Sequence, residues 1–507
     1  MRNQEIFVSL DIGTTSIKVV VAESNNGRVN IIGVGNEKSR GLSRGVIVDI
    51  DETVYSIQQA IQQAERKAGV KINEVAVGIP SNLLAIEECH GMVAVSSETR
   101  EITAKDVDNV ISAAKVRSVP PEREIISIIP EEFIVDGFAG IRDPRGMIGV
   151  RLELYARILT GPKTIIHNIR RCVERAGYKI NELIVQPQAL AEVVLDEDER
   201  NFGTVIIDMG GGQTSASIIY DDQLKYSFVD QEGGDFVTKD ISIILNTSLD
   251  SAERIKREYG YAIASQTSED EFFPVETVGK KEPVRVDEHY LAEIIEARLN
   301  QIFQVIYDDL ERVEGLDLPG GFVITGGASS LPGTLELAQR YFGDQVRLYV
   351  PEEMGMRNPI YATSLGMIEY IAGLDDIHRI AQGTYPQLRK EQPRQGLTRQ
   401  PRQASQGQAF GQGQQREDYG QRNQRPQFDN SRDYERQAPV QQQRAPQREE
   451  VNYEEAYHNY QGESQEDLYQ EDYQDQQQEQ YVENNQPAQN SEGFMGKIQQ
   501  FFQTFFD

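Results

Sequence analysis

The chain has 507 residues, and its 80 Asp and Glu against 51 Lys and Arg give a formal net charge of −29. This acidity excludes a nucleic-acid binder that works through a basic surface, because an acidic chain repels the phosphate backbone. Two cysteines are too few for a disulfide framework and indicate a reducing compartment, and no run of about 18 apolar residues predicts a bilayer-spanning helix.

The first predicted element is a hairpin. A strand over residues 6–10 leads into Asp11-Ile-Gly-Thr-Thr-Ser16, and a second strand follows over residues 17–22. Glycine turns let backbone N–H groups face an anion, hydroxyl side chains add donors, and an Asp at the strand end can hold Mg²⁺ through water. The pattern predicts a phosphate-binding turn, with an ordinary Gly-Thr turn as the alternative.

The sequence pattern of residues 83–162 predicts a compact α+β segment. Thr103-Ala-Lys-Asp106 resembles a capping box that begins a helix expected over residues 104–116. A strand is expected over residues 124–130, and Glu131-Glu132 is interpreted as a solvated loop pair. The segment has no cluster of His, Cys and carboxylates suited to chemistry.

The pattern of the first hairpin returns later in the chain. A strand over residues 204–207 leads into Asp208-Met-Gly-Gly-Gly-Gln-Thr-Ser215 and a strand over residues 216–219. One such hairpin is weak evidence. Two of them, each heading an α/β half, predict a clamp that holds a triphosphate from both sides.

A third glycine-rich turn joins a strand over residues 322–325 to a helix over residues 334–341. Paired glycines permit close approach by a flat base or ribose, although an ordinary strand-to-helix loop fits the pattern too. The chain has no Gly-x₄-Gly-Lys-[Ser/Thr] motif, and Gly33-x-Gly35 lacks the third glycine of a dinucleotide-binding turn.

The composition changes abruptly after residue 385. Residues 386–492 hold 28 Gln and no Ile or Met, so they predict a disordered linker, because they offer too little apolar surface to offset the entropy of ordering. The linker is split by charge: residues 386–448 carry +6 and residues 449–492 carry −13. Solvated tails usually have such blocks.

The last residues, 493–507, predict an amphipathic helix. Its polar face has one cation, Lys497, which Asp507 offsets. The pattern favours a membrane surface or a partner's groove over a helix that docks back on the core. The apolar face consists of Phe494, Met495, Ile498, Phe501, Phe502, Phe505 and Phe506.

Paired phosphate hairpins, an adenosine loop and connecting helices resemble the actin-like ATPase superfamily over about residues 6–372. With the segment at 83–162 and the terminal helix, the chain is similar to the FtsA family of cell-division proteins. The implied fold class is α/β: an actin-like two-lobed ATPase core with an inserted small α+β subdomain, then a disordered linker and a C-terminal amphipathic helix. The expected bounds are 1–82, 163–195 and 355–385 for the first lobe, 83–162 for the insert, 196–354 for the second lobe with a roof at about 227–300, 386–492 for the linker and 493–507 for the helix.

The resemblance also implies the site residues. Asp11 and Asp208 would hold Mg²⁺ through water, and Lys18 either reaches a phosphate or faces solvent from its strand. Gln188 matches the Gln that orients the attacking water in actin-type ATPases, or it is simply a polar residue near a helix start. The residues expected to bind ATP are Asp11, Gly13, Thr14, Thr15, Ser16 and Lys18 in the first hairpin, Asp208, Gly210, Gly211, Gly212 and Thr214 in the second, Gly233, Gly234, Glu253 and Lys256 in the roof, and Gly326, Gly327 and Ala328 on the adenosine side.

The function that the resemblance implies is an ATP-binding scaffold of cell division with at most slow ATPase activity. Its expected partners are FtsZ, further copies of the chain, membrane lipid and other division proteins, at the cytoplasmic face of the membrane at the division site. An actin-like scaffold of pilus assembly or cell shape is an alternative. A carbohydrate kinase, which shares the first hairpin motif, and a heat-shock-class chaperone are more distant ones.

Overall fold

The computed structural model describes residues 5–25, 28–116 and 119–385. The linker predicted at 386–492 and the helix predicted at 493–507 lie outside these residues. Among the residues that are described, no helix is long and apolar enough to cross a membrane.

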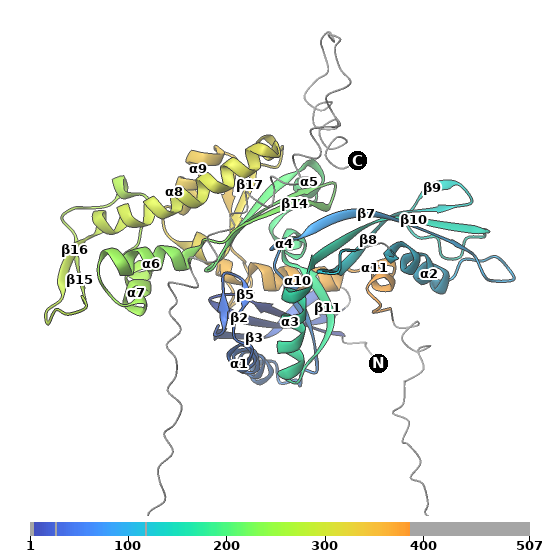
Figure 1. Ribbon diagram of the computed structural model, residues 1–507, viewed down its shortest axis with the longest axis horizontal. Coiled ribbons are helices and arrows are strands. Elements are labelled where there is room, and N and C mark those ends of the chain that lie inside the picture. Colours follow the sequence, from blue (N-terminus) through green and yellow to red (C-terminus); the bar gives the residue numbers. More distant parts are fainter. Residues whose placement is uncertain (1–4, 26–27, 117–118, 386–507) are drawn as a thin grey trace, which may run out of the picture. The chain divides into compact units, whose positions relative to one another are not determined.

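Two five-stranded sheets with the same strand pattern form the two lobes (Figure 1). In each sheet the first three strands in sequence pair antiparallel, and two later strands extend the sheet in parallel from the first. The first sheet has the order β11 (Lys179–Val185), β6 (Glu74–Ile79), β1 (Glu5–Ile12), β2 (Ser16–Asn25), β3 (Arg28–Lys38). The second has the order β14 (Gln223–Asp230), β13 (Thr214–Tyr220), β12 (Thr204–Met209), β17 (Phe322–Thr325), β18 (Val346–Leu348).

The first sheet is buried on both faces, as its continuous apolar strands require. On β2, Val19 and Val21 belong to the core under α1 (Ile50–Ala68) and α3 (Lys163–Arg175), whereas Val20 and Ala22 pack toward α10 (Ala362–Gly373). The pair Gly33-x-Gly35 has its explanation here, because a Cβ on Gly35 would stand 1.9 Å from the carbonyl oxygen of Ala60 on α1. These glycines serve helix–sheet packing.

Two crossing helices lie between the sheets (Figure 1). Helix α10 packs on β1 and β2, while α4 (Gln186–Val194) contacts α10, β13 and β14. Their backbones come very close, because a Cβ on Gly366 would stand 2.2 Å from the carbonyl oxygen of Ala189.

The inserted subdomain has its own sheet and core. The sheet order is β7 (Ala85–Ala94), β10 (Arg151–Pro162), β8 (Arg123–Val135), β9 (Phe138–Ile141), and α2 (Ala104–Lys115) and α11 (Asp376–Ala381) pack on it. The capping box predicted at Thr103 and Asp106 is present.

The prediction of a solvated loop at Glu131-Glu132 is wrong. Strand β8 continues through both residues, because its pairing with β10 resumes across an irregularity: Tyr155 faces Glu132 and Ala156 faces Pro130. Glu131 is the extra residue of this bulge, and its carboxylate lies 2.7 Å from Nε of Arg157.

The remaining elements belong mainly to the second lobe. Helices α6 and α7 form a roof beside the hairpin of β15 and β16, and the long helix α8 packs against α6, α9 and β14. The bounds are α5 (Glu197–Phe202), α6 (Gly234–Ile244), α7 (Leu249–Tyr259), β15 (Phe272–Val275), β16 (Val284–Asp287), α8 (Glu288–Arg312), α9 (Thr334–Phe342), the short β4 (Leu42–Ser43) and β5 (Val46–Ile47), and four 3₁₀ turns, η1 (Ala264–Gln266), η2 (Gly315–Asp317), η3 (Gly327–Ser330) and η4 (Pro359–Tyr361).

Candidate functional site

The turns of the two hairpins meet. The Oγ1 atom of Thr15 lies 1.8 Å from the position that a Cβ on Gly211 would take, and Oγ1 and Cγ2 of Thr14 lie 2.6 Å from such a position on Gly212. A larger residue at either glycine would push the hairpins apart. The structure thus brings Thr14 and Thr15 of the first turn against Gly211 and Gly212 of the second.

The strand that opens the first hairpin ends in a buried polar cluster. Asp11 is 4% exposed and Lys18 is 8% exposed, and Nζ of Lys18 donates to Oδ2 of Asp11 at 3.0 Å. The ammonium group also lies near the turn at Gly13, 3.4 Å from the position of a Cβ there. Of the two alternatives for Lys18, the structure excludes the solvent-facing one.

Asp208 ends the corresponding strand of the second sheet. Burial and then the nearby charge of Asp11 raise its pKa to about 6, while Lys18 and a hydrogen bond with Thr363 act in the opposite direction. Asp11 and Asp208, one carboxylate from each lobe, are a donor set that a hydrated Mg²⁺ would accept.

Gly326 joins the third glycine-rich turn, between β17 and α9, to this cluster. A Cβ at Gly326 would stand 2.3 Å from Oδ1 of Asp208, and the residue has φ of 91°, so glycine is required on both counts. The next residues form η3, where the Cβ of Ala328 lies 3.2 Å from the Cβ position of Gly234. Gly326 to Ala328 and Gly233 to Gly234 therefore adjoin.

The glycine pair that begins α6 rests on the second hairpin. The N–H of Gly234 donates to the carbonyl oxygen of Gly210 at 3.0 Å, and a Cβ on Gly233 would stand 2.6 Å from the carbonyl oxygens of Gly210 and Gly211. Thr214 anchors the other end of the turn by donating from Oγ1 to the carbonyl oxygen of Glu232 at 2.9 Å.

The predicted roof pair is tied to this glycine pair. Nζ of Lys256 donates to the carbonyl oxygen of Gly234 at 2.8 Å and to Oγ1 of Thr238 at 2.7 Å. Glu253 lies 2.7 Å from the same ammonium group and accepts from Thr238 at 2.6 Å. The i,i+3 pair thus belongs to a polar network that includes Thr238 and the carbonyl group of Gly234.

Gln186, the first residue of the connecting helix α4, contacts the first hairpin. Its Nε2 donates to Oδ1 of Asp11 at 2.9 Å. Gln188, two residues later on α4, is partly buried. Sequence reasoning passed over Gln186 because it lies at the helix start, before Pro187, where a polar residue is unremarkable.

Asp235 is a second residue that the sequence analysis did not single out. It follows the glycine pair, its N–H donates to the carbonyl oxygen of Gly211 at 2.8 Å, and its carboxylate approaches Oγ1 of Thr15. Burial raises its pKa. The sequence signal that could have found Asp235 is its position directly after the Gly-Gly pair at the start of a helix.

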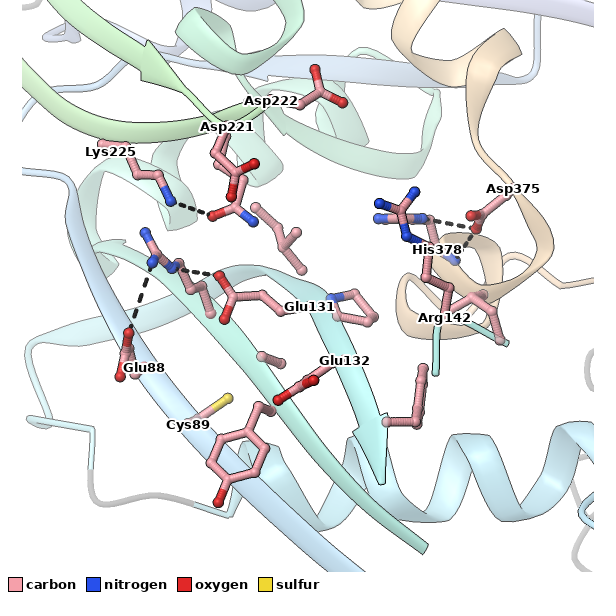
Figure 2. A pocket seen from close by; sticks show the side chains of 18 of the residues that line it. Glu88, Cys89, Glu131, Glu132, Arg142, Asp221, Asp222, Lys225, Asp375 and His378 are labelled. Carbon is pink, nitrogen blue, oxygen red and sulfur yellow. Dashed lines mark hydrogen bonds and ion pairs between the residues drawn. The ribbon is translucent and has the colours of Figure 1, made fainter. Parts of the chain in front are cut away.

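A separate cavity of about 880 Å³ lies between the inserted subdomain and the second lobe (Figure 2). None of the predicted site residues lines it. Figure 2 shows Lys225 on one side and Glu88 and Glu131 on the other, with Asp375 and His378 from the segment that enters α11. Burial and the charge of Arg157 lower the pKa of Lys225 to about 8.

Two family models match the chain. The model described as "Cell division protein FtsA" matches residues 205–366, and that described as "SHS2 domain inserted in FTSA" matches residues 82–160.

Relatives described as "Cell division protein FtsA" align over most of the chain. The protein of Enterococcus faecalis is 58% identical over 386 residues, which cover 76% of this chain and 88% of the relative. The Bacillus subtilis protein is 46% identical over 73% of this chain and 84% of its own length. The Escherichia coli K12 protein is 34% identical over 73% and 90%.

Among solved structures, the "PilM-PilN type IV pilus biogenesis complex" matches with a TM-score of 0.51 and 16% identity, over 73% of this chain and 99% of that one. At this identity the likeness shows a common fold alone. It agrees with the two-lobed actin-like fold expected from the sequence, which is confirmed for the described residues.

Proposed function

The chain belongs to the FtsA family of bacterial cell-division proteins, and from this membership we propose that it binds ATP with Mg²⁺ between its lobes and links FtsZ to the cytoplasmic face of the membrane at the division site. The observation that carries the nucleotide part is the meeting of the two glycine hairpins over Asp11, Lys18 and Asp208.

The residues present fit the nucleotide. Gly211 and Gly212 bring the second turn into contact with the hydroxyl residues Thr14 and Thr15, Lys18 supplies a buried positive charge beside the turn at Gly13, and Asp11 with Asp208 suits a water-bound Mg²⁺. Bound there, Mg²⁺ would neutralise phosphate charge. The adjoining Gly233-Gly234 and Gly326 to Ala328, under the network of Glu253 and Lys256, would receive the adenosine.

We expect hydrolysis to be slow at most. An amide orients water but is a poor base, and the connector offers amides at Gln186 and Gln188. Gln186 is tied to Asp11, the proposed Mg²⁺ residue, so it is the better-placed of the two to organise water near the phosphates.

The proposed FtsZ surface lies in the second lobe after Gly234. Large apolar side chains are exposed along this part of the chain, and a partner would bury such surface on binding. They are Ile243, Ile244, Leu249, Phe272 and Val278.

Membrane attachment is proposed for residues 493–507 on the sequence pattern. Seven apolar side chains at roughly 1.5–2 kcal/mol each give about 10–14 kcal/mol gross, of which association and folding consume a large part. Binding by one copy should therefore be reversible, and self-association would add avidity. If residues 386–492 are the flexible linker that the sequence predicts, these 107 residues would span about 50–60 Å, so the core need not touch lipid.

The pilus-scaffold alternative is less well supported. The likeness to the PilM–PilN complex is one of fold at 16% identity, whereas the division proteins reach 58%. A carbohydrate kinase would need a carboxylate base facing a sugar pocket, and no motif of the sequence places one.

Co-sedimentation tests the proposal. The full chain, with FtsZ and liposomes, should carry FtsZ into the pellet more strongly with ATP·Mg²⁺ than without nucleotide. Deleting residues 493–507 should abolish the liposome-dependent pellet and leave the melting temperature of the core unchanged.

A matched control replaces Gln499 and Gln503, on the polar face of the helix, by Ser. This variant should still pellet, whereas Phe501→Ser with Phe505→Ser should not, because only the second pair removes apolar surface. Sedimentation that does not depend on residues 493–507 would contradict the membrane part of the proposal.

A further inference from the structure

Asp235 and Thr15 form a side-chain contact between the lobes. Thr15 belongs to the first hairpin and Asp235 to the first turn of α6 in the second lobe. Oγ1 of Thr15 lies 3.4 Å from Oδ1 and 3.5 Å from Oδ2 of the carboxylate, within reach of a long hydrogen bond. The N–H of Asp235 donates to the carbonyl oxygen of Gly211, which holds the carboxylate against the second hairpin.

The contact occupies the space between the hairpins. A Cβ on Gly211 would stand 1.8 Å from Oγ1 of Thr15 and 3.1 Å from Oδ1 of Asp235, so hydroxyl, carboxylate and glycine share one small volume. Thr15 and Gly211 are also among the residues of the two hairpins that the resemblance implies for ATP binding. A terminal phosphate would therefore meet Asp235.

Two physical effects make this meeting unfavourable. The Thr15 hydroxyl has one proton, so it donates either to Asp235 or to a phosphate oxygen. A carboxylate and a phosphate a few ångströms apart repel each other. Burial already raises the pKa of Asp235, while Lys256 partly compensates, so its negative charge is poorly solvated before any phosphate enters.

We propose that Asp235 is a specificity-determining residue of the ATP site, whose carboxylate competes with the terminal phosphate for the Thr15 hydroxyl and so weakens binding of a nucleoside triphosphate more than binding of the diphosphate. The inference rests on the proposed ATP site. In the ligand-free protein the contact between Thr15 and Asp235 links the two lobes. The terminal phosphate of a bound nucleotide would replace this contact.

The test is Asp235→Asn in the full chain, which keeps the shape of the side chain and removes its charge. Dissociation constants for fluorescent ATP and ADP are measured with Mg²⁺. ATP affinity should rise roughly tenfold and ADP affinity by less than about threefold, because only ATP places a charge next to Asp235. The matched control is Asp250→Asn, an exposed acid in the first turn of α7, which should change neither constant.

A measurement without nucleotide separates this role from a general effect. Thr15→Val and Asp235→Ala, alone and combined, enter a double-mutant cycle on the denaturation midpoint of the ligand-free protein. The two changes should be non-additive, because each removes the same contact. If Asp235→Asn fails to fold, Asp235→Ser takes its place, since Ser is also favoured near a helix start.

The outcomes are distinguishable. The inference is overturned if Asp235→Asn leaves the ratio of ATP affinity to ADP affinity unchanged or lowers the affinity for ATP. The proposed ATP site would still stand in that case. A wild-type chain that binds neither nucleotide overturns both.

Discussion

Gly326 is held at the centre of the candidate site by two constraints that only glycine meets. Its φ of 91° lies where L side chains are strained, and a Cβ would stand 2.3 Å from Oδ1 of Asp208 and 2.6 Å from the carbonyl oxygen of Met209. The sequence indicated a close approach here by base or ribose. The structure adds that the proposed Mg²⁺ carboxylate is itself the near neighbour.

Gly326→Ala should therefore lower the free energy of unfolding by more than strain alone, by about 2–4 kcal/mol in total, and should weaken ATP binding. The matched control is Gly343→Ala, since Gly343 has φ of 82° with nothing within 4 Å of its Cβ position. Chemical denaturation measures both, and equal losses in the two variants would contradict a steric role for the site.

The bounds of helices and strands match those predicted from the sequence where the residues that set them are neighbours in the chain. Helix α2 begins at its predicted capping box, in which Thr103 and Asp106 bond each other's backbone N–H groups. The end of β8 was missed, because a bulge at Glu131 is set by pairing with β10. Strand length in a sheet depends on the partner strand, and the run of local residues does not reveal it.

Thr103→Ala should destabilise the chain by about 1 kcal/mol, because it removes the hydroxyl that accepts from the N–H of Asp106 at 3.4 Å and donates to the Asp106 carboxylate at 2.7 Å. Thr103→Ser keeps the oxygen and is the control. Thermal or urea denaturation monitored on the full chain gives the difference, and an equal loss with Ser would assign the effect to the lost methyl group.

At the scale of the whole molecule, the inserted subdomain and the second lobe face each other across the cavity of Figure 2. Lys225 of β14 is 8% exposed there, and burial with the nearby Arg157 lowers its pKa to about 8 from 10.5, against the opposing charges of Asp221, Glu131 and Glu88. The ammonium group of Lys225 is therefore poorly solvated at this junction.

The stability of the chain should respond to pH through Lys225. Since its folded pKa lies below the unfolded one, the folded state binds fewer protons between pH 8 and 10.5, and this residue's contribution to stability rises with pH across that window. Lys225→Met should raise the free energy of unfolding at pH 7 by about 1–3 kcal/mol and flatten that rise. Lys179→Met, at an exposed lysine, should do neither; a loss of stability in Lys225→Met at pH 7 would contradict the prediction.

The sequence by itself determined the features whose causes are local. Two Asp-x-Gly hairpins, the Gly-Gly pairs, a helix cap and the split in charge between a −22 portion at 1–385 and the following segments are all legible in neighbouring residues. Such patterns fix which turns can approach an anion and which segments can form a core, and the α/β class followed from them.

Only the tertiary structure decided which side chains from distant segments meet. It gave Asp11 a hydrogen bond from Gln186, brought Asp235 to Thr15, and packed Gly35 against Ala60 of α1. Each of these depends on a partner from a different part of the chain. Spacing along one segment carries no information about such a partner, because close packing between elements, and not local propensity, sets the distance.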